Sequence, residues 1–194
     1  MTVMSPLTTI DLEFLQAPEQ GDATSAAVPE ARGHRGGVIV AHGVDLGRLD
    51  HERFAQMAVD DALRRKLAPY LGLTGSEARA LLSAGPLRLS PAQVRQLDTA
   101  VHEPLIAELM ERFERCGGIA WHALSVTAAT VLVREALCQD TVLERSCPRL
   151  WRAAVAGDQA AMLRVLHDTG EVPAERVMQA TEYLEQTMLD AESY

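Results

Sequence analysis

The chain has 194 residues, 47% of them hydrophobic and 23% charged, which is enough to bury the core of a compact domain. Its 18 basic and 27 acidic residues leave a formal net charge of −9, which argues against a general nucleic-acid binder and against docking on an anionic surface. No apolar run approaches the ~20 residues that span a bilayer. We therefore expect neither nucleic acid nor a membrane among its partners.

The N-terminal segment and the cysteines bear on the cellular compartment. Residues 1–16 carry acids rather than a basic region and lack a long apolar stretch, so no standard signal peptide is expected. Cys116, Cys138 and Cys147 cannot all pair with one another and lack C-x-x-C spacing. We expect unpaired thiols and synthesis in the cytoplasm, with a dedicated route for any role outside it.

The first fifty residues combine a short helix, a loop and one β segment. Residues 8–17 are predicted as an amphipathic stretch with Ile10 and Phe14 on one face. Residues 18–37 are rich in glycine and small polar residues, which is typical of a loop. Residues 37–47 contain a β-branched run between glycines, which predicts a short β-hairpin.

From Asp50 onward the helical period of apolar residues dominates. Thr74 and Glu77 have the spacing of a capping box, and Ser90-Pro91 places proline at the first position of the next helix. The expected helices are 51–70 with a break near its middle, 75–83, 91–113, 123–138, 149–155, 158–168 and 173–189.

Two of these helices indicate where the core lies. The helix at 91–113 has an apolar stripe, and the helix at 123–138 is apolar on nearly every side, which predicts a buried central helix. The stripe consists of Val94, Leu97, Val101, Leu105 and Leu109. The predicted fold class is α+β and mostly α: a single domain over residues 1–194, with a hairpin region at 8–50 and a helical lobe at 51–190.

The histidines do not follow a metal-binding pattern. His42 is near His34 and His51 in the sequence, with Asp45 and Asp50 close by, but none of the spacings matches a known ligand set. No nucleotide-binding or serine-hydrolase motif occurs. We therefore expect no metal and no cofactor.

Two acidic residues have an arrangement that suggests chemistry. Glu19 follows the first short helix, and Asp45 lies at the turn of the predicted hairpin. Glycoside hydrolysis uses one carboxylic acid to protonate the leaving oxygen and a second carboxylate to activate water or stabilise the cation. Acidic residues are common in this chain, 27 of 194, so solvent-facing charges explain the pair better when it is considered alone.

Further segments resemble a known family in their order and spacing. Glu19–Gly21, Val28–Pro29 and Gly36–Gly47 are similar to the signature of pesticin-like, phage-type lysozymes: Glu-Gly, then Tyr-Val-Pro, then Gly-Val-Thr-Ile-Gly-x-Gly-x-Asp-Leu-Gly. Other similar segments lie at 69–75, 85–90, 97–101, 129–132, 148–151, 157–161 and 179–184. The resemblance covers about residues 10–186. It implies a phage-lysozyme-like fold and a muramidase that cuts peptidoglycan glycan strands, as in a bacteriocin and in tail domains of type VI secretion spike proteins.

The resemblance also implies roles for individual residues. Glu19 would be the general acid and Asp45 its catalytic partner. The positions implied for substrate binding are Ile39, His42, Ala129 and Arg176.

Several of these positions depart from the family pattern. Ile39 stands where the family has the threonine that positions the attacking water, and Ala27 stands where it has a tyrosine. Ala129 replaces a glutamine, and Glu175 replaces the first of two arginines, which leaves Arg176 alone. Each change removes a polar or stacking group, so the resemblance implies a degenerate site.

Three interpretations follow from the sequence. The first is a bacteriolytic muramidase, weakened or inactive, delivered to the periplasm of a target cell by a secretion or tail-like system. The second is a non-catalytic lysozyme-fold module that binds the glycan strand or a protein of a type VI secretion or phage-tail-like machine. The third is an unrelated helical protein whose hairpin imitates the motif.

Overall fold

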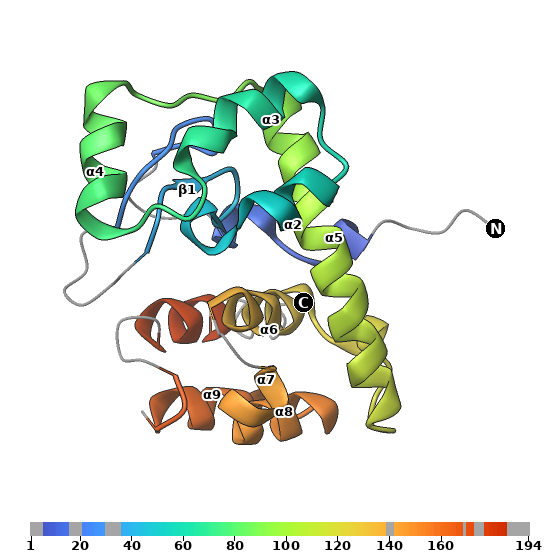
Figure 1. The fold of residues 1–194 in the computed structure, drawn as a ribbon. Coiled ribbons are helices and arrows are strands. Elements are labelled where there is room, and N and C mark those ends of the chain that lie inside the picture. Colours follow the sequence, from blue (N-terminus) through green and yellow to red (C-terminus); the bar gives the residue numbers. More distant parts are fainter. Residues whose placement is uncertain are drawn as a thin grey trace. The chain divides into compact units, whose positions relative to one another are not determined.

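The computed structural model describes residues 6–15, 21–29, 36–138, 142–168, 170–172 and 177–185. The chain separates into two compact units, which are described one at a time. Unit 1 comprises residues 1–11 and 105–194, and unit 2 comprises residues 12–104. Figure 1 shows the elements along the chain. Helix α5 (Pro91–Arg115) begins in unit 2 and ends in unit 1.

Unit 2 contains the predicted hairpin and several short helices. Strands β1 (Ile39–Val40) and β2 (Val44–Asp45) pair antiparallel, with Ile39 opposite Asp45 and Val40 opposite Val44. The hairpin predicted at 37–47 is therefore confirmed. The other elements of this unit are α1 (Leu12–Leu15), η3 (Leu46–Arg48), α2 (His51–Gln56), α3 (Asp61–Leu67), η4 (Ala68–Tyr70) and α4 (Gly75–Ala84).

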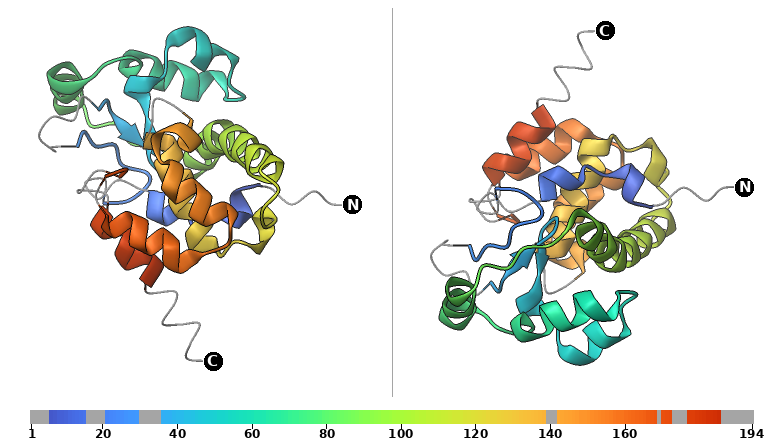
Figure 2. Two further views of the ribbon diagram at one scale, coloured as in Figure 1. Left: turned by 90° about the horizontal axis from the view of Figure 1, so that it is seen from below. Right: turned by 90° about the horizontal axis from the view of Figure 1, so that it is seen from above.

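Two extended segments add to the hairpin. Ala27 and Ile39 exchange backbone hydrogen bonds of 3.0 and 2.7 Å, which places Ala27 directly opposite Ile39 on the free side of β1. On the side away from β1, the segment at 24–27 forms backbone hydrogen bonds with residues 87–89. The backbone at 24–27 thus lies between β1 and residues 87–89. Figure 2 gives two further views of the ribbon.

The hydrophobic core of unit 2 lies on one face of this small sheet. Val38, Val40 and Val44 are buried there together with apolar side chains of the helices. Those helical residues include Phe54, Leu63, Leu67, Ala78, Val94 and Leu97. Because successive side chains of a strand alternate between faces, Ile39 and Asp45 project from the opposite face.

The helix starts show which capping signals are used. The Ser90 hydroxyl accepts from the Gln93 N–H at 3.2 Å, and the Gln93 side chain accepts from the Ser90 N–H at 3.0 Å. This reciprocal pair is a capping box, and it precedes an α5 that starts at Pro91 as predicted. Thr74 is the N-cap residue of α4, but its side chain makes no capping hydrogen bond, so the capping box predicted at Thr74 and Glu77 is wrong.

The predicted stripe on α5 is confirmed at three of its five positions. Val94 and Leu97 are buried, whereas Val101 and Leu105 are half-buried. Beyond Pro104, which lies inside the helix, the buried residues are Ile106, Leu109 and Phe113. Between Leu97 and Leu109 the buried side of the helix runs through Asp98, His102 and Ile106 instead of Val101 and Leu105.

Unit 1 is helical around α6 (Val126–Cys138) in its described part. Residues 127–133 and Glu135 of this helix are buried, which confirms the predicted central helix. Its other elements are η1 (Pro6–Thr9), η5 (Trp121–Ala123), α7 (Leu143–Ser146), α8 (Pro148–Val155), α9 (Gln159–His167) and the helical residues 177–185. Helix α7 was not predicted from the sequence. Helices α8 and α9 pack against each other.

The N-terminal stretch is not one amphipathic helix. It consists of η1, a bend at Ile10 and then α1, with Ile10 and Leu15 buried and Phe14 half-buried. The backbone N–H of Asp11 donates to the hydroxyl of Thr130 at 2.8 Å rather than to a carbonyl one turn earlier, so the helix has to restart. The continuous stretch predicted at 8–17 is therefore wrong over residues 8–15, and residues 16 and 17 lie outside the described residues.

A hydrogen-bonded cluster holds Asp11 to the rest of unit 1. The hydroxyl of Tyr183 donates to the Asp11 carboxylate at 2.9 Å. Burial of the phenol, followed by its hydrogen bond to Asp11, raises the pKa of Tyr183 to about 12. Tyr183 and Thr130 thus hold the chain at Asp11 from two sides.

Two expectations about the whole chain can be compared with the described residues. Within them, every helix is too short or too polar to cross a bilayer. Cys116 is exposed, Cys138 half-buried and Cys147 buried, and no disulfide joins these three residues.

Candidate active site

Three positions of the family-like pattern form one row across the sheet of unit 2. Ala27 is paired with Ile39, and Ile39 is paired with Asp45. Directly opposite residues of antiparallel strands place their side chains on the same face, so all three share the face turned away from the core of unit 2. Ala27 and Ile39 are each 7% exposed, and the Asp45 side chain is 13% exposed. The structure therefore brings Ile39 and Asp45 together.

The carboxylate of Asp45 is held by the backbone. Its Oδ1 accepts from the N–H of Gly37 at 3.0 Å and from the N–H of Gly47 at 2.8 Å. The second bond caps η3. Its Oδ2 lies 3.8 Å from Nε of Arg48. Asp45 therefore has a structural role in addition to any chemistry, because one of its oxygens joins the two ends of the hairpin.

The two glycines that bracket the hairpin are required by this arrangement. A Cβ on Gly37 would lie 2.4 Å from Cα of Gly47, and a Cβ on Gly47 would lie 2.7 Å from both Cα of Gly37 and the carbonyl oxygen of Leu73. Real Cβ atoms essentially never approach backbone so closely. Only glycine at both positions lets the two N–H groups reach the same carboxylate oxygen.

We expect Gly47→Ala to destabilise the protein by about 1–3 kcal/mol, because the added methyl has to push two backbone segments apart. Chemical denaturation followed by circular dichroism measures the change. Gly85→Ala is the matched control, since a Cβ there meets nothing within 4 Å. Equal stability of the two variants would contradict the close packing of Gly37 and Gly47.

The turn at residues 41–43 packs against the end of α1. Gly43 has φ +79°, and a Cβ on it would lie 2.4 Å from the carbonyl oxygen of Leu15, the last residue of α1. Ala41 has φ +48° and is fully buried, although this left-handed conformation favours glycine. The family pattern has glycine at both positions, so Ala41 keeps the turn conformation at a cost in strain.

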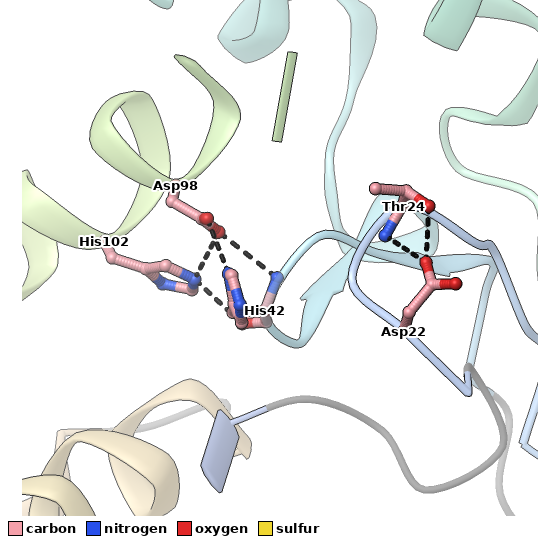
Figure 3. A network of polar contacts seen from close by, with 5 residues as sticks. All are labelled: Asp22, Thr24, His42, Asp98 and His102. Carbon is pink, nitrogen blue, oxygen red and sulfur yellow. Dashed lines mark hydrogen bonds and ion pairs between the residues drawn. The ribbon is translucent and has the colours of Figure 1, made fainter. Parts of the chain in front are cut away.

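His42, at the tip of the turn, is bound to helix α5 of the same unit. Its Nδ1 lies 2.7 Å from Oδ2 of Asp98, and its backbone N–H donates to Oδ1 of Asp98 at 3.2 Å. Nε2 of His102 lies 2.8 Å from the backbone oxygen of His42 and 3.4 Å from Oδ1 of Asp98. Figure 3 shows both α5 side chains directed at the turn. His42 thus has a clear structural role, whereas its predicted part in substrate binding stays a prediction.

Asp98 and His102 are important residues that the sequence analysis missed. Asp98 is 2% exposed and His102 fully buried. Burial by itself raises the pKa of the Asp98 carboxyl, but the hydrogen bonds from His102 and His42 outweigh it and lower the pKa to about 2. One signal was present: the two residues are four apart and lie beside Val94, Leu97 and Val101, on the buried side of the helix.

A second carboxylate shapes the start of the extended segment at 24–27. Oδ1 of Asp22 accepts from the backbone N–H of Thr24 at 2.7 Å and from the Thr24 hydroxyl (Figure 3). These hydrogen bonds lower the pKa of Asp22. The turn they form leads the chain into pairing with β1.

The remaining predicted site residues are not brought into this row by the described structure. Ala129 lies on α6 in unit 1, is 2% exposed and donates its N–H to the carbonyl of Ser125 in the ordinary helical pattern. Glu19 and Arg176 lie outside the described residues. Within the described part of the chain, no three His, Cys, Asp or Glu side chains have the arrangement of a metal site.

Comparison with known proteins places these features in a family. A search of curated proteins gives no match. Residues 9–160, well over half of the chain, match the family model Pesticin, described as a bacterial toxin homologue of phage lysozyme, C-terminal part. The matched range includes the whole hairpin with Ile39 and Asp45, together with Asp98 and His102. The chain therefore belongs to the Pesticin family of phage-lysozyme homologues.

Proposed function

We propose that this protein is a muramidase that cleaves the glycan strand of peptidoglycan, with Glu19 as the general acid and Asp45 as its catalytic partner. Membership of the Pesticin family supports the substrate and the reaction class. The observation that carries the proposal for Asp45 is its pairing with Ile39, the position of the family's water-positioning threonine. A spacing of six residues puts these two side chains next to each other on one face of the hairpin.

The division of labour between the carboxyl groups follows from glycoside chemistry. Glu19 protonates the leaving oxygen as the bond to the anomeric carbon breaks. Asp45 supplies negative charge close to the developing oxocarbenium ion, and the N–H groups of Gly37 and Gly47 fix where that charge lies. Because Oδ1 takes both N–H bonds, Oδ2 is the oxygen of Asp45 that is proposed to serve the reaction.

The loss of Glu19 tests this proposal. Glu19→Gln keeps the size of the side chain and removes the proton donor, which we expect to reduce wall lysis by about 10²–10⁴-fold. The measurement is a zymogram on purified peptidoglycan together with dye release in solution. Glu13→Gln, an exposed position on α1, is the control. Equal lysis by wild type and Glu19→Gln would overturn the proposal.

A second candidate function is a non-catalytic module that binds the glycan strand or a protein of a secretion or phage-tail-like machine. The specific observation in its favour is that Ala27 and Ile39, the neighbours of Asp45 in the row, carry no polar atoms in their side chains. The net charge of −9 also favours it, because a free lysin benefits from a cationic face on an anionic wall.

Ile39→Thr distinguishes the two functions. A hydroxyl opposite Asp45 restores a hydrogen-bonding group for water, and a single such group is worth about 10²–10³ in rate. We expect hydrolytic wall lysis to rise by at least tenfold in a weakened enzyme. A module that only binds would sediment with insoluble peptidoglycan, or be recovered with a protein partner, and would release no fragments before or after the substitution.

A further inference from the structure

Two side chains of helix α5 bind both polar groups of one backbone residue in the hairpin turn. The N–H of His42 donates to Oδ1 of Asp98 at 3.2 Å, and the backbone oxygen of His42 lies 2.8 Å from Nε2 of His102. A carbonyl oxygen only accepts, so Nε2 of His102 carries the proton and donates it. The imidazole of His42 adds a third contact, since its Nδ1 lies 2.7 Å from Oδ2 of Asp98. The tip of the turn is thus bonded at three points to one helix (Figure 3).

Stability of the core alone does not require these two polar side chains. Asp98 is 2% exposed and His102 is fully buried, and burial of a charged group costs free energy that its partners have to offset. Well-packed apolar side chains of similar volume often give equal or greater stability. They cannot fix the direction of a backbone N–H or C=O, however, whereas an acceptor for one and a donor for the other can. The cluster therefore specifies the conformation of the turn.

The turn needs such contacts because its backbone is strained. Ala41, directly before His42, has φ +48°, and Gly43, directly after it, has φ +79°. The left-handed conformation is unfavourable for alanine, and strained backbone persists only where the surrounding structure over-determines it. Asp98 and His102 supply these contacts at the residue between the two positive φ angles.

The strand that leaves this turn carries Asp45. Asp45 lies two residues beyond Gly43, on β2, and its Oδ1 is bound at the other end of the hairpin by the N–H groups of Gly37 and Gly47. The carboxylate thus lies between two fixed points: these two glycines and the turn. A change at either point moves it.

We infer that Asp98 and His102 are positioning residues of the proposed reaction, which hold the carboxylate of Asp45 in place through the turn at His42. The inference rests on the proposed function, in which that carboxylate stabilises the developing cation. The effect of both residues on the reaction passes through Asp45. A misplacement of about 1 Å can lower a rate about 10²-fold, so a displaced turn is enough to impair the reaction.

The first experiment compares kcat with stability in three variants of the full-length protein. Asp98→Ala removes the acceptor of the His42 N–H, and we expect kcat on soluble glycan-strand fragments to fall about 10–100-fold, with KM within about threefold of wild type. Asp98→Asn keeps an oxygen for that N–H and offers an amide N–H to Nδ1 of His42, so kcat should stay within about threefold of wild type. Leu109→Ala is the control. Leu109 is fully buried on the part of α5 that belongs to unit 1, so its truncation should lower the unfolding temperature comparably and leave kcat unchanged.

All rates are measured below the unfolding temperature of each variant, so that loss of folded protein does not contribute. If Asp98→Ala does not fold, His102→Leu, which removes the donor to the His42 backbone oxygen, replaces it with the same expected results. Wild-type kcat in Asp98→Ala would overturn the inference. An equal loss of kcat in Leu109→Ala or in Asp98→Asn would overturn it as well.

The second experiment does not depend on activity. The N–H groups of Gly37 and Gly47 donate to Oδ1 of Asp45, so their hydrogen-exchange rates, measured by NMR, report how firmly that carboxylate is held. We expect both to exchange at least tenfold faster in Asp98→Ala than in Leu109→Ala. Equal rates in the two variants would overturn the inference, whatever the rates of lysis. If the wild type releases no fragments, the proposed function fails, whereas the faster exchange would still show that Asp98 holds the carboxylate.

Discussion

Asp45→Asn is expected to lower the rate of peptidoglycan cleavage by about 10²–10³-fold while leaving the stability of the fold within about 1 kcal/mol of wild type. Asparagine keeps an oxygen at the position of Oδ1, and that oxygen can still accept from the N–H groups of Gly37 and Gly47. The substitution removes the negative charge that stabilises the oxocarbenium ion. Dye release from labelled peptidoglycan measures the rate, and thermal unfolding measures the stability.

Two further variants separate charge from structure. Asp45→Ala removes the acceptor as well as the charge, which leaves the Gly37 N–H without its partner and η3 without its cap. We expect a loss of about 2–4 kcal/mol in addition to the loss of rate. Asp50→Asn is the control, since Asp50 also caps a helix through its side chain but lies outside the row. If Asp45→Asn were as active as wild type, Asp45 would have a structural role only.

Asp98→Ala is expected to destabilise the protein by about 3–5 kcal/mol, the largest effect on stability that we predict for one substitution. The variant leaves the backbone N–H and Nδ1 of His42 without their acceptor, inside a fully buried contact with His102. For a chain of this length, the melting temperature should fall by about 6–20 °C. Asp61→Ala is the control, because the carboxylate of Asp61 is 87% exposed and its ion pair with Arg64 should contribute less than about 1 kcal/mol.

The same carboxylate makes stability depend on pH. The pKa of Asp98 falls from 3.8 in the unfolded chain to about 2 in the folded protein. Its contribution is therefore fully present above about pH 4 and is lost as the pH falls toward 2; the shift corresponds to about 2 kcal/mol. Unfolding curves at several pH values should show this loss in wild type and a smaller one in Asp98→Ala. The same pH dependence of the free energy of unfolding in both proteins would contradict this role of Asp98.

The sequence predicted the elements of this fold better than the contacts that connect them. The buried α6 and the hairpin at 37–47 were predicted because their apolar patterns are long or bracketed by glycines. Helix α7 was missed because four residues carry no periodicity. The capping box was assigned to Thr74 rather than Ser90 because both sites have the required spacing, and only the geometry of the loop before the helix decides between them.

The candidate site was predictable to a similar extent. The family pattern identified Ile39 and Asp45, and the strand register places them together. The contact of Asp98 and His102 with His42 joins residues 56 and 60 positions apart, which no local pattern contains. The second role of Asp45, as an acceptor for Gly37 and Gly47, also depends on three-dimensional packing.

The register of the hairpin has a consequence for insertions and deletions. Only residues 41–43 connect the paired strands, and Ile39 is opposite Asp45 because that connection has this length. One residue more or fewer would move the carboxylate of residue 45 to the face that holds Val40 and Val44, where it would have to be buried in hydrocarbon. Variants with one residue inserted into or deleted from this loop should therefore be tolerated as poorly as variants that lack the Asp45 carboxylate, although no side chain has been altered.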